Sequence, residues 1–265
     1  MPTIGPLRPW EIASVVFFAY TVAATMALPG LAGRRRGQAL AGAAAGIGLA
    51  IASTLLPATP VMHDWLFPPA LLLLAYWSSG RLFVAPMARA ERALLRVDEA
   101  LGIRKTAGRT PRIVAELLEI AYVGVYPVIP IALTIFLLET PSPDPARFWT
   151  IVLVTDYICF GVLPWVQTRP PRALDPAPPW RSSFRAVNLH LLGTTSIQVN
   201  TFPSGHAAEA VAVALLVAAA PWPLAAAVAI AALLVSAGAV LGRYHYAADA
   251  FAGWGVAVVV WVACR

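Results

Sequence analysis

The sequence contains a succession of apolar runs, most of which approach the length needed to cross a lipid bilayer. One transmembrane helix needs about 20 such residues, and the runs recur along most of this 265-residue chain. Charged residues make up only 12% of the chain, against about 25% in soluble domains. This composition excludes disorder and argues against a soluble globule. The sequence therefore predicts an all-α integral membrane protein.

We expect about eight transmembrane helices separated by short polar segments. The first apolar run is too long for a signal peptide and ends in three arginines rather than a cleavage site. The third run contains Pro68 and Pro69, which also fit a broken or re-entrant helix. The expected spans are residues 10–31, 39–56, 65–87, 113–138, 148–165, 205–221, 224–241 and 247–263.

Two segments outside these spans differ from the others. Residues 88–103 place apolar side chains on one helical face and charged side chains on the rest. This pattern is typical of a helix lying at a membrane surface, or of a short soluble hairpin helix. Residues 166–203 form a long polar segment, and its five prolines between positions 170 and 179 prevent a helical start.

The basic residues are unevenly distributed around the eight expected spans. If both termini lie on one side of the membrane, that side receives three basic residues and the other side receives sixteen. The positive-inside rule then places segment 166–203 in the cytoplasm, and we expect a multi-pass protein of a prokaryotic plasma membrane. We attribute the net charge of +6 to arginines in loops that face the cytoplasm and to arginines that bind phosphate. No nucleic-acid partner is expected, because the basic groups lack a solvated face.

Three polar clusters, at residues 168–172, 202–206 and 243–249, adjoin predicted helix ends on that same side. Two histidines can divide the roles of nucleophile and general acid. An aspartate one helical turn after a histidine can orient its ring. Arginine side chains and the free N–H groups of a helix start suit phosphate oxygens. Together the clusters can bind a phosphate, attack its phosphorus and protonate the leaving oxygen.

The clusters contain Pro-Ser-Gly-His at 203–206 and His-Tyr-x-x-Asp at 245–249. This pair of strings resembles two motifs of the type 2 phosphatidic acid phosphatase superfamily, which includes lipid phosphatases, polyprenyl diphosphate phosphatases and inositolphosphorylceramide synthases. The resemblance covers about residues 160–253 and implies the core helical bundle of that superfamily. We accordingly expect a six-helix catalytic membrane domain at 65–265, including helix 88–103 and segment 166–203, and two additional transmembrane helices within 1–64.

The resemblance implies a two-step mechanism that uses neither a metal nor another cofactor. His245 is the implied nucleophile and forms a phosphohistidine, Asp249 orients it, and His206 protonates the leaving alkoxide and then activates water or another acceptor. The phosphate-binding residues expected from the motifs and their neighbours are Arg169, Arg172, Ser204, Gly205 and Arg243.

Two positions depart from the family pattern. Val162 stands where the first motif usually has a lysine, and Ala239 stands where the third motif usually has an arginine. We expect Arg172 to supply the first missing charge, while Arg243 is a displaced form of the second. The Pro-Pro-Arg and Arg-x-His strings resemble the branch related to inositolphosphorylceramide synthases, which transfers phosphorylated head groups.

Three functions remain open on these observations. The leading hypothesis is a phosphatase acting on a lipid phosphate or polyprenyl (di)phosphate, whose tail is held among membrane lipids by the apolar spans. The second is a phosphotransferase that moves a phosphorylated head group between lipids. The third is a non-catalytic lipid-binding or transport protein on the same scaffold.

Some residues outside the motifs also receive expectations. Glu209, Tyr122 and Tyr126 are expected to line the substrate cavity, and Pro127 and Pro130 are expected to kink the helix that carries the two tyrosines. His63 and His190 are expected at the surface, and Arg181 and Arg185 on an interfacial turn near lipid head groups.

Overall fold

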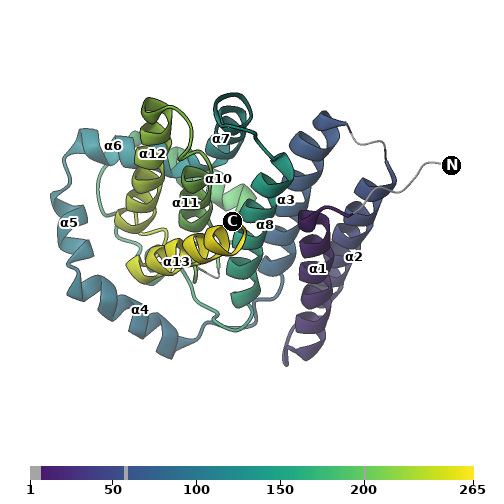
Figure 1. The fold of residues 1–265 in the computed structure, drawn as a ribbon. Helices are drawn as coiled ribbons and strands as arrows, with labels where there is room; N and C mark the ends of the chain where they lie inside the picture. The colour runs from purple at the N-terminus through teal and green to yellow at the C-terminus, as the bar shows by residue number, and fades with distance from the viewer. Residues whose placement is uncertain (1–6, 57–58, 200) are drawn as a thin grey trace.

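The computed structural model describes residues 7–56, 59–199 and 201–265, and these residues form helices and connecting loops with no β-strand among them (Figure 1). The predicted all-α class is therefore confirmed. The helices are α1 (Pro9–Ala27), α2 (Gly33–Leu55), α3 (Phe67–Gly80), α4 (Ala88–Ala100), α5 (Ile103–Arg109), α6 (Arg112–Val123), α7 (Val125–Glu139), α8 (Pro145–Val162), α9 (Pro171–Leu174), α10 (Ser183–Thr195), α11 (Gly205–Leu216), α12 (Trp222–Leu241) and α13 (Ala247–Ala263).

The first two helices form an antiparallel pair at one side of the molecule (Figure 1). Their close approach depends on Gly46, because a Cβ atom there would lie 2.3 Å from the Phe18 ring. The pair is joined to the rest of the bundle through α3 and α8. The Tyr157 ring stacks on Phe17 at 4.4 Å between centroids, and its hydroxyl lies 2.8 Å from the Ser14 hydroxyl.

The centre of the bundle is formed by α8 and α11, which pack against each other and against α7 and α13. Three consecutive α8 side chains, Ile151 to Leu153, are fully buried. The approach of α13 to α11 requires Gly253, since a Cβ atom there would lie 2.5 Å from the Ser204 carbonyl oxygen. The two predicted histidine motifs are thus carried by helices in direct contact.

Eight full spans are not confirmed. Within the described residues, four helices are long and apolar enough to cross a membrane, namely α1, α2, α8 and α12, and α6 with α7 becomes a fifth if the bent pair is one span. The helices α3, α11 and α13 have 14, 12 and 17 residues, below the usual length of about 20. These spans are consistent with a membrane protein.

The predicted span at 113–138 is bent in the structure, as its prolines led us to expect. Helices α6 and α7 meet at Gly124 with a bend of 65°. The physical cause is Pro127, which has no N–H to donate to the carbonyl four residues earlier and whose ring crowds that carbonyl. Tyr122, near the end of α6, and Tyr126, near the start of α7, therefore lie on either side of the bend.

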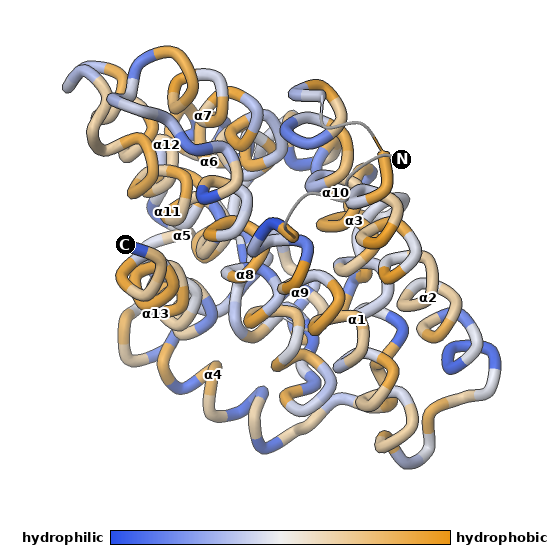
Figure 2. Tube along the Cα trace, turned by 45° about the vertical axis from the view of Figure 1, so that its right-hand side comes forward, coloured by the Kyte–Doolittle hydropathy of each residue, from blue (hydrophilic) through white to orange (hydrophobic). Residues whose placement is uncertain are grey.

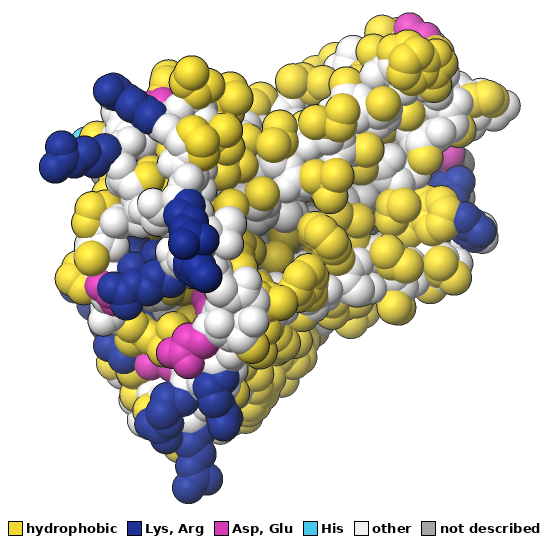
Figure 3. Space-filling view, turned by 90° about the vertical axis from the view of Figure 1, so that its left-hand side faces the viewer, with side chains coloured by type: hydrophobic (Ala, Val, Ile, Leu, Met, Phe, Trp, Pro, Cys, Tyr) yellow, Lys and Arg dark blue, Asp and Glu magenta, His cyan; other side chains and the backbone are white. Residues whose placement is uncertain are grey.

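Helix α4 confirms the predicted amphipathic helix, with hydrophilic and hydrophobic residues alternating along it in Figure 2. It ends at Ala100, and two residues later Gly102, whose positive φ of 65° favours glycine, turns the chain into α5. Figure 3 shows Lys and Arg side chains gathered towards one edge of this end of the molecule, while hydrophobic side chains cover much of the remaining face.

The expectation for His63 is wrong. Its side chain is only 3% exposed, because it belongs to a π-helical turn (Val61–Leu66) folded back on the end of α2. The ring contacts two carbonyl oxygens, with Nε2 2.9 Å from that of Ser53 and Nδ1 3.2 Å from that of Thr59. His190, on α10, is exposed as expected.

Candidate active site

A cavity of about 670 Å³ lies among α3, α7, α8, α10 and α11. Most of its wall is aromatic or aliphatic, with Trp65, Tyr76 and Phe160 among the lining residues. His206, His245 and Arg172 also line it and provide ionisable groups. Such a wall suits an apolar ligand that carries a compact anionic group.

The two motif histidines face each other across this cavity, with ring centroids 5.9 Å apart. His206 is the second residue of α11, and His245 lies in the short loop before α13. The Nδ1 atom of His245 lies 3.1 Å from the Thr201 carbonyl oxygen. A carbonyl can only accept, so Nδ1 carries the hydrogen and Nε2 of the neutral ring keeps its lone pair.

Asp249 supports His245 from behind. It is fully buried, and its Oδ2 atom lies 3.4 Å from His245 Nδ1 and accepts a hydrogen bond from the Tyr246 N–H at 3.0 Å. Its backbone carbonyl accepts from the Ser204 N–H at 3.0 Å. The first turn of α13 therefore connects both histidine motifs.

The expected cavity residues are found there. Tyr122, Tyr126 and Glu209 all line the cavity. The Tyr122 ring lies nearly parallel to that of His206, with centroids 5.5 Å apart, and stacks on Tyr244 at 4.1 Å. Tyr126 meets His206 edge-on at 5.9 Å. Aromatic rings thus hold the His206 imidazole from two sides.

The structure separates the three motif arginines. Arg172 alone among them lines the cavity, with its guanidinium 5.3 Å from the Tyr244 ring centroid. Burial lowers the pKa of Arg172 from its ordinary value, although an arginine stays charged. Of the expected phosphate ligands with a cationic side chain, Arg172 is the one placed beside both histidines.

Arg169 and Arg243 direct their side chains elsewhere. Arg169 forms a two-pronged ion pair with Glu91 of α4, from Nε at 2.9 Å and Nη2 at 3.0 Å. Their hydrogen bonds lower the pKa of Glu91 and raise the pKa of Arg169. Arg243, in a left-handed conformation with φ 63°, donates to Asp175 at 3.1 Å. The sequence did not reveal either acidic partner.

Ser204 and Gly205 occupy the start of α11 in different ways. Ser204 is fully buried and caps the helix, accepting from the Ala207 N–H at 3.3 Å. Gly205 lines the cavity, and a Cβ atom there would lie 3.1 Å from Phe160 and 3.2 Å from Asp156 Oδ1. The positive end of the α11 dipole therefore opens onto the cavity at Gly205, which favours an anion.

The structure shows the surroundings of Ala239 and Val162, the two positions that depart from the family pattern. Ala239 is fully buried and packs with Tyr122, Leu192 and Tyr244, so this position has no room for an arginine. Its carbonyl accepts from the N–H groups of Tyr244 and His245, both at 2.9 Å. These two hydrogen bonds to the Ala239 backbone fix the loop that carries His245. Val162, the other departure, is the last residue of α8.

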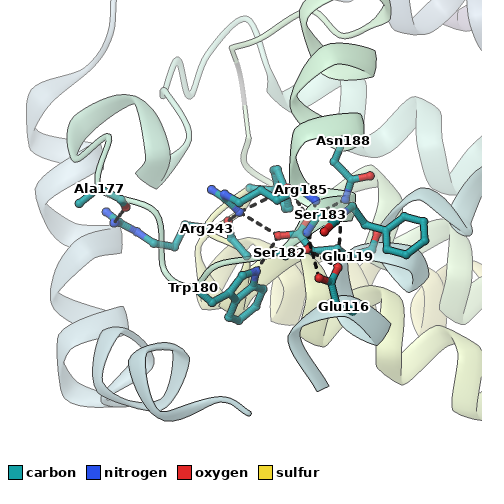
Figure 4. Close-up of polar contacts among 12 residues, drawn as sticks. Glu116, Glu119, Ala177, Trp180, Ser182, Ser183, Arg185, Asn188 and Arg243 are labelled. Atoms are coloured by element: carbon teal, nitrogen blue, oxygen red, sulfur yellow. Dashed lines mark hydrogen bonds and ion pairs between the residues drawn. The ribbon is translucent and has the colours of Figure 1, made fainter. Parts of the chain in front are cut away.

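Glu119, which sequence patterns did not place in the site, anchors this loop from α6. It is fully buried and accepts from Arg185 at 3.0 Å and from the Tyr244 hydroxyl at 2.6 Å. It also accepts from Trp180 and Asn188, so one carboxylate joins α6, the polar segment and the loop before His245 (Figure 4). Arg185 is therefore buried rather than interfacial as expected, whereas Arg181 is exposed.

Helix α4 contributes a second support. The Asp98 Oδ1 atom accepts from the Ala247 N–H at 2.8 Å, at the first residue of α13. With Glu91 bound to Arg169, one amphipathic helix contacts the first and third motifs. Burial raises the pKa of Asp98 to about 6, and the nearby Asp249 adds to this effect.

A protein-family model described as PAP2 superfamily matches residues 86–263. The match starts just before α4 and includes all three polar clusters. No curated protein and no solved structure gave a significant match.

We predict that Glu119→Ala strongly destabilises the protein. The change leaves the buried Arg185 guanidinium without its carboxylate, which costs about 3–5 kcal/mol of unfolding free energy. Thermal unfolding in detergent measures the effect. Glu139→Ala, at the exposed end of α7, is the control and should change the melting temperature little. Equal melting temperatures for both variants contradict the role assigned to Glu119.

A second prediction concerns the pH dependence of stability. The pKa of Asp98 rises on folding from 3.8 to about 6, so the folded state binds this proton more tightly. Stability from this group is therefore present below about pH 4 and is lost as the pH rises to about 6. Asp98→Asn retains an oxygen for the Ala247 N–H but cannot ionise, so its melting temperature should fall less over this range. The same slope in the variant and wild type contradicts this, and Glu99→Gln, at an exposed neighbour, is the control.

Proposed function

The chain belongs to the PAP2 superfamily, and on this premise we propose that it is a membrane-embedded phosphatase acting on a lipid phosphate or polyprenyl (di)phosphate. Phosphatases make up much of this superfamily, which supports an enzymatic role. The observation that carries the proposal is the pair of histidines facing one largely apolar cavity, 5.9 Å apart, with Asp249 behind His245.

In the proposed first step, the Nε2 atom of His245 attacks phosphorus, and the bond from phosphorus to the alcohol oxygen breaks. His206 enters this step protonated and gives its proton to the leaving oxygen. The phosphoryl group is then bound to His245, whose imidazolium character is stabilised by Asp249. Water next attacks phosphorus while His206 accepts its proton, which releases phosphate and restores His245.

Phosphate binding is assigned mainly to Arg172 and the start of α11. Arg172 supplies a fixed positive charge beside the histidines, and Gly205 lets the α11 backbone approach the anion. For Arg169 and Arg243, binding phosphate requires leaving Glu91 and Asp175. In the proposed mechanism these two arginines act by holding the motif loops.

The apolar part of the cavity is proposed to hold the lipid tail next to the phosphate. Its aromatic and aliphatic walls suit hydrocarbon, and neighbouring membrane lipids complete the environment. We propose that the site faces the cytoplasm of a prokaryotic plasma membrane. The uneven distribution of basic residues supports this orientation.

Replacing either motif histidine tests the mechanism. We expect His245→Ala to abolish phosphate release from a lipid phosphate, because the nucleophile is lost. His206→Ala should lower kcat by about 10²–10⁴-fold through loss of general acid catalysis. Release is measured on detergent-solubilised protein, with and without a chelator, which should leave the rate unchanged. His190→Ala at the exposed surface is the control, and full activity in either site variant excludes this mechanism.

Transfer of a phosphorylated head group is the second candidate function. The Arg243-x-His245 arrangement supports it, and the chemistry is identical until an alcohol replaces water in the second step. Incubating the protein with a donor lipid and candidate alcohols, followed by mass spectrometry of the lipids, distinguishes the two. We expect free phosphate as the main product. A new phosphorylated lipid formed in the presence of an acceptor favours transfer instead.

The third candidate is a non-catalytic lipid-binding or transport protein. Lipid binding or transport that persists after replacement of both histidines, together with no turnover by the wild type, favours that role over the proposed enzyme.

A further inference from the structure

Two acidic side chains line the cavity beside the histidine pair without a role in the proposed phosphate chemistry. They are Asp156 on α8 and Glu209 on α11. Asp156 is fully buried, and neither of its carboxylate oxygens has a hydrogen-bond partner among the described residues. No ion pair involves either acid in the described part of the chain.

Both acids lie close to His206. Glu209 follows it by three residues on α11, which puts the two side chains on one helical face about 4.5 Å apart along the axis. Asp156 approaches the same turn from α8, since its Oδ1 atom lies 3.2 Å from where a Cβ atom on Gly205 would stand. Glu209 therefore lies almost one turn beyond His206, and Asp156 lies beside the residue that precedes it. The two acids flank the position from which His206 would protonate the leaving alcohol.

Burial makes an unsatisfied carboxyl group unfavourable, and acids within membrane proteins are therefore usually paired or functional. Glu119 illustrates the paired case in this chain, with four side chains donating to it. Asp156 has no comparable protein donor among the described residues. Because Asp156 lies on the cavity wall, a bound ligand can supply the missing hydrogen-bond donor.

We propose that Asp156 and Glu209 form a subsite for a hydroxyl or ammonium group on the alcohol part of the substrate. This inference rests on the proposed function, which places the phosphate at His245 and Arg172. The hydroxyl or ammonium group that donates to the two acids then lies a few bonds from the ester oxygen of the substrate. The favoured substrates are lipid phosphates with a polar donor beside the phosphoester, and a plain polyprenyl phosphate lacks such a donor.

The test uses long-chain phosphate monoesters that differ only beside the ester. One is a simple alkyl phosphate, one carries a hydroxyl on the second carbon, and one carries an ammonium there. We expect wild-type kcat/KM to be about tenfold or more higher for at least one donor-bearing ester. A preference for only one of them identifies the group that the subsite takes. Equal values for all three esters overturn the proposal.

Asp156→Asn and Glu209→Gln assign the preference to the two acids. In each variant, kcat/KM for the preferred ester should fall about tenfold more than kcat/KM for the alkyl phosphate. Glu99→Gln, at an exposed acid on α4, is the control and should retain the preference. An equal fall in kcat on every ester, with a shifted pH profile, indicates proton relay to His206 and overturns the subsite.

Binding of the free alcohols separates this inference from the proposed function, because it needs no turnover. The protein should be stabilised against heat more by the matching amino alcohol or diol than by the plain alcohol, and each acid variant should lose this difference. If the free alcohols stabilise the protein with this selectivity but no ester releases phosphate, the proposed phosphatase function is rejected and the subsite is retained. Phosphate release without selectivity in either assay retains the phosphatase and rejects the subsite.

Discussion

The hydrogen bond from the Ser204 N–H to the Asp249 carbonyl connects the two halves of the candidate site. It joins the start of α11, which carries His206, to the first turn of α13, which follows His245. The close helix contact at Gly253 allows this bond, because a side chain there would collide with the Ser204 carbonyl. The separation of the two histidines therefore depends on main-chain geometry, which other parts of the bundle hold in place.

The buried charges of the bundle serve different purposes. Glu119 is satisfied by several donors and fixes the loop before His245, while Glu91 and Asp98 connect α4 to the first and third motifs. Asp156 has no partner among the described residues and faces the cavity. Paired acids thus support the architecture, and the unpaired acid marks a place where the cavity can recognise a ligand.

Sequence patterns predicted the helical class and the amphipathic character of α4, because helical periodicity is a local signal. The structure places Tyr122, Tyr126 and Glu209, the residues expected in a substrate cavity, on the wall of the cavity beside the two histidines. The prolines indicated a kink in the span at 113–138, but sequence patterns did not predict that it divides the span into two helices at Gly124. They also did not predict the short α11, since the apolar run extends past the end of that helix. Sequence patterns also did not reveal the ion pair between Arg169 and Glu91. A contact between residues 78 positions apart depends on tertiary packing.

The proposed mechanism depends on phosphoryl transfer through His245. The most direct measurement is to quench the wild-type protein during turnover of a radiolabelled lipid phosphate and to locate the bound label by mass spectrometry. We expect an acid-labile, base-stable phosphoryl group on His245, absent from the His245→Ala variant. A label on another residue, or phosphate release by His245→Ala at the wild-type rate, contradicts it.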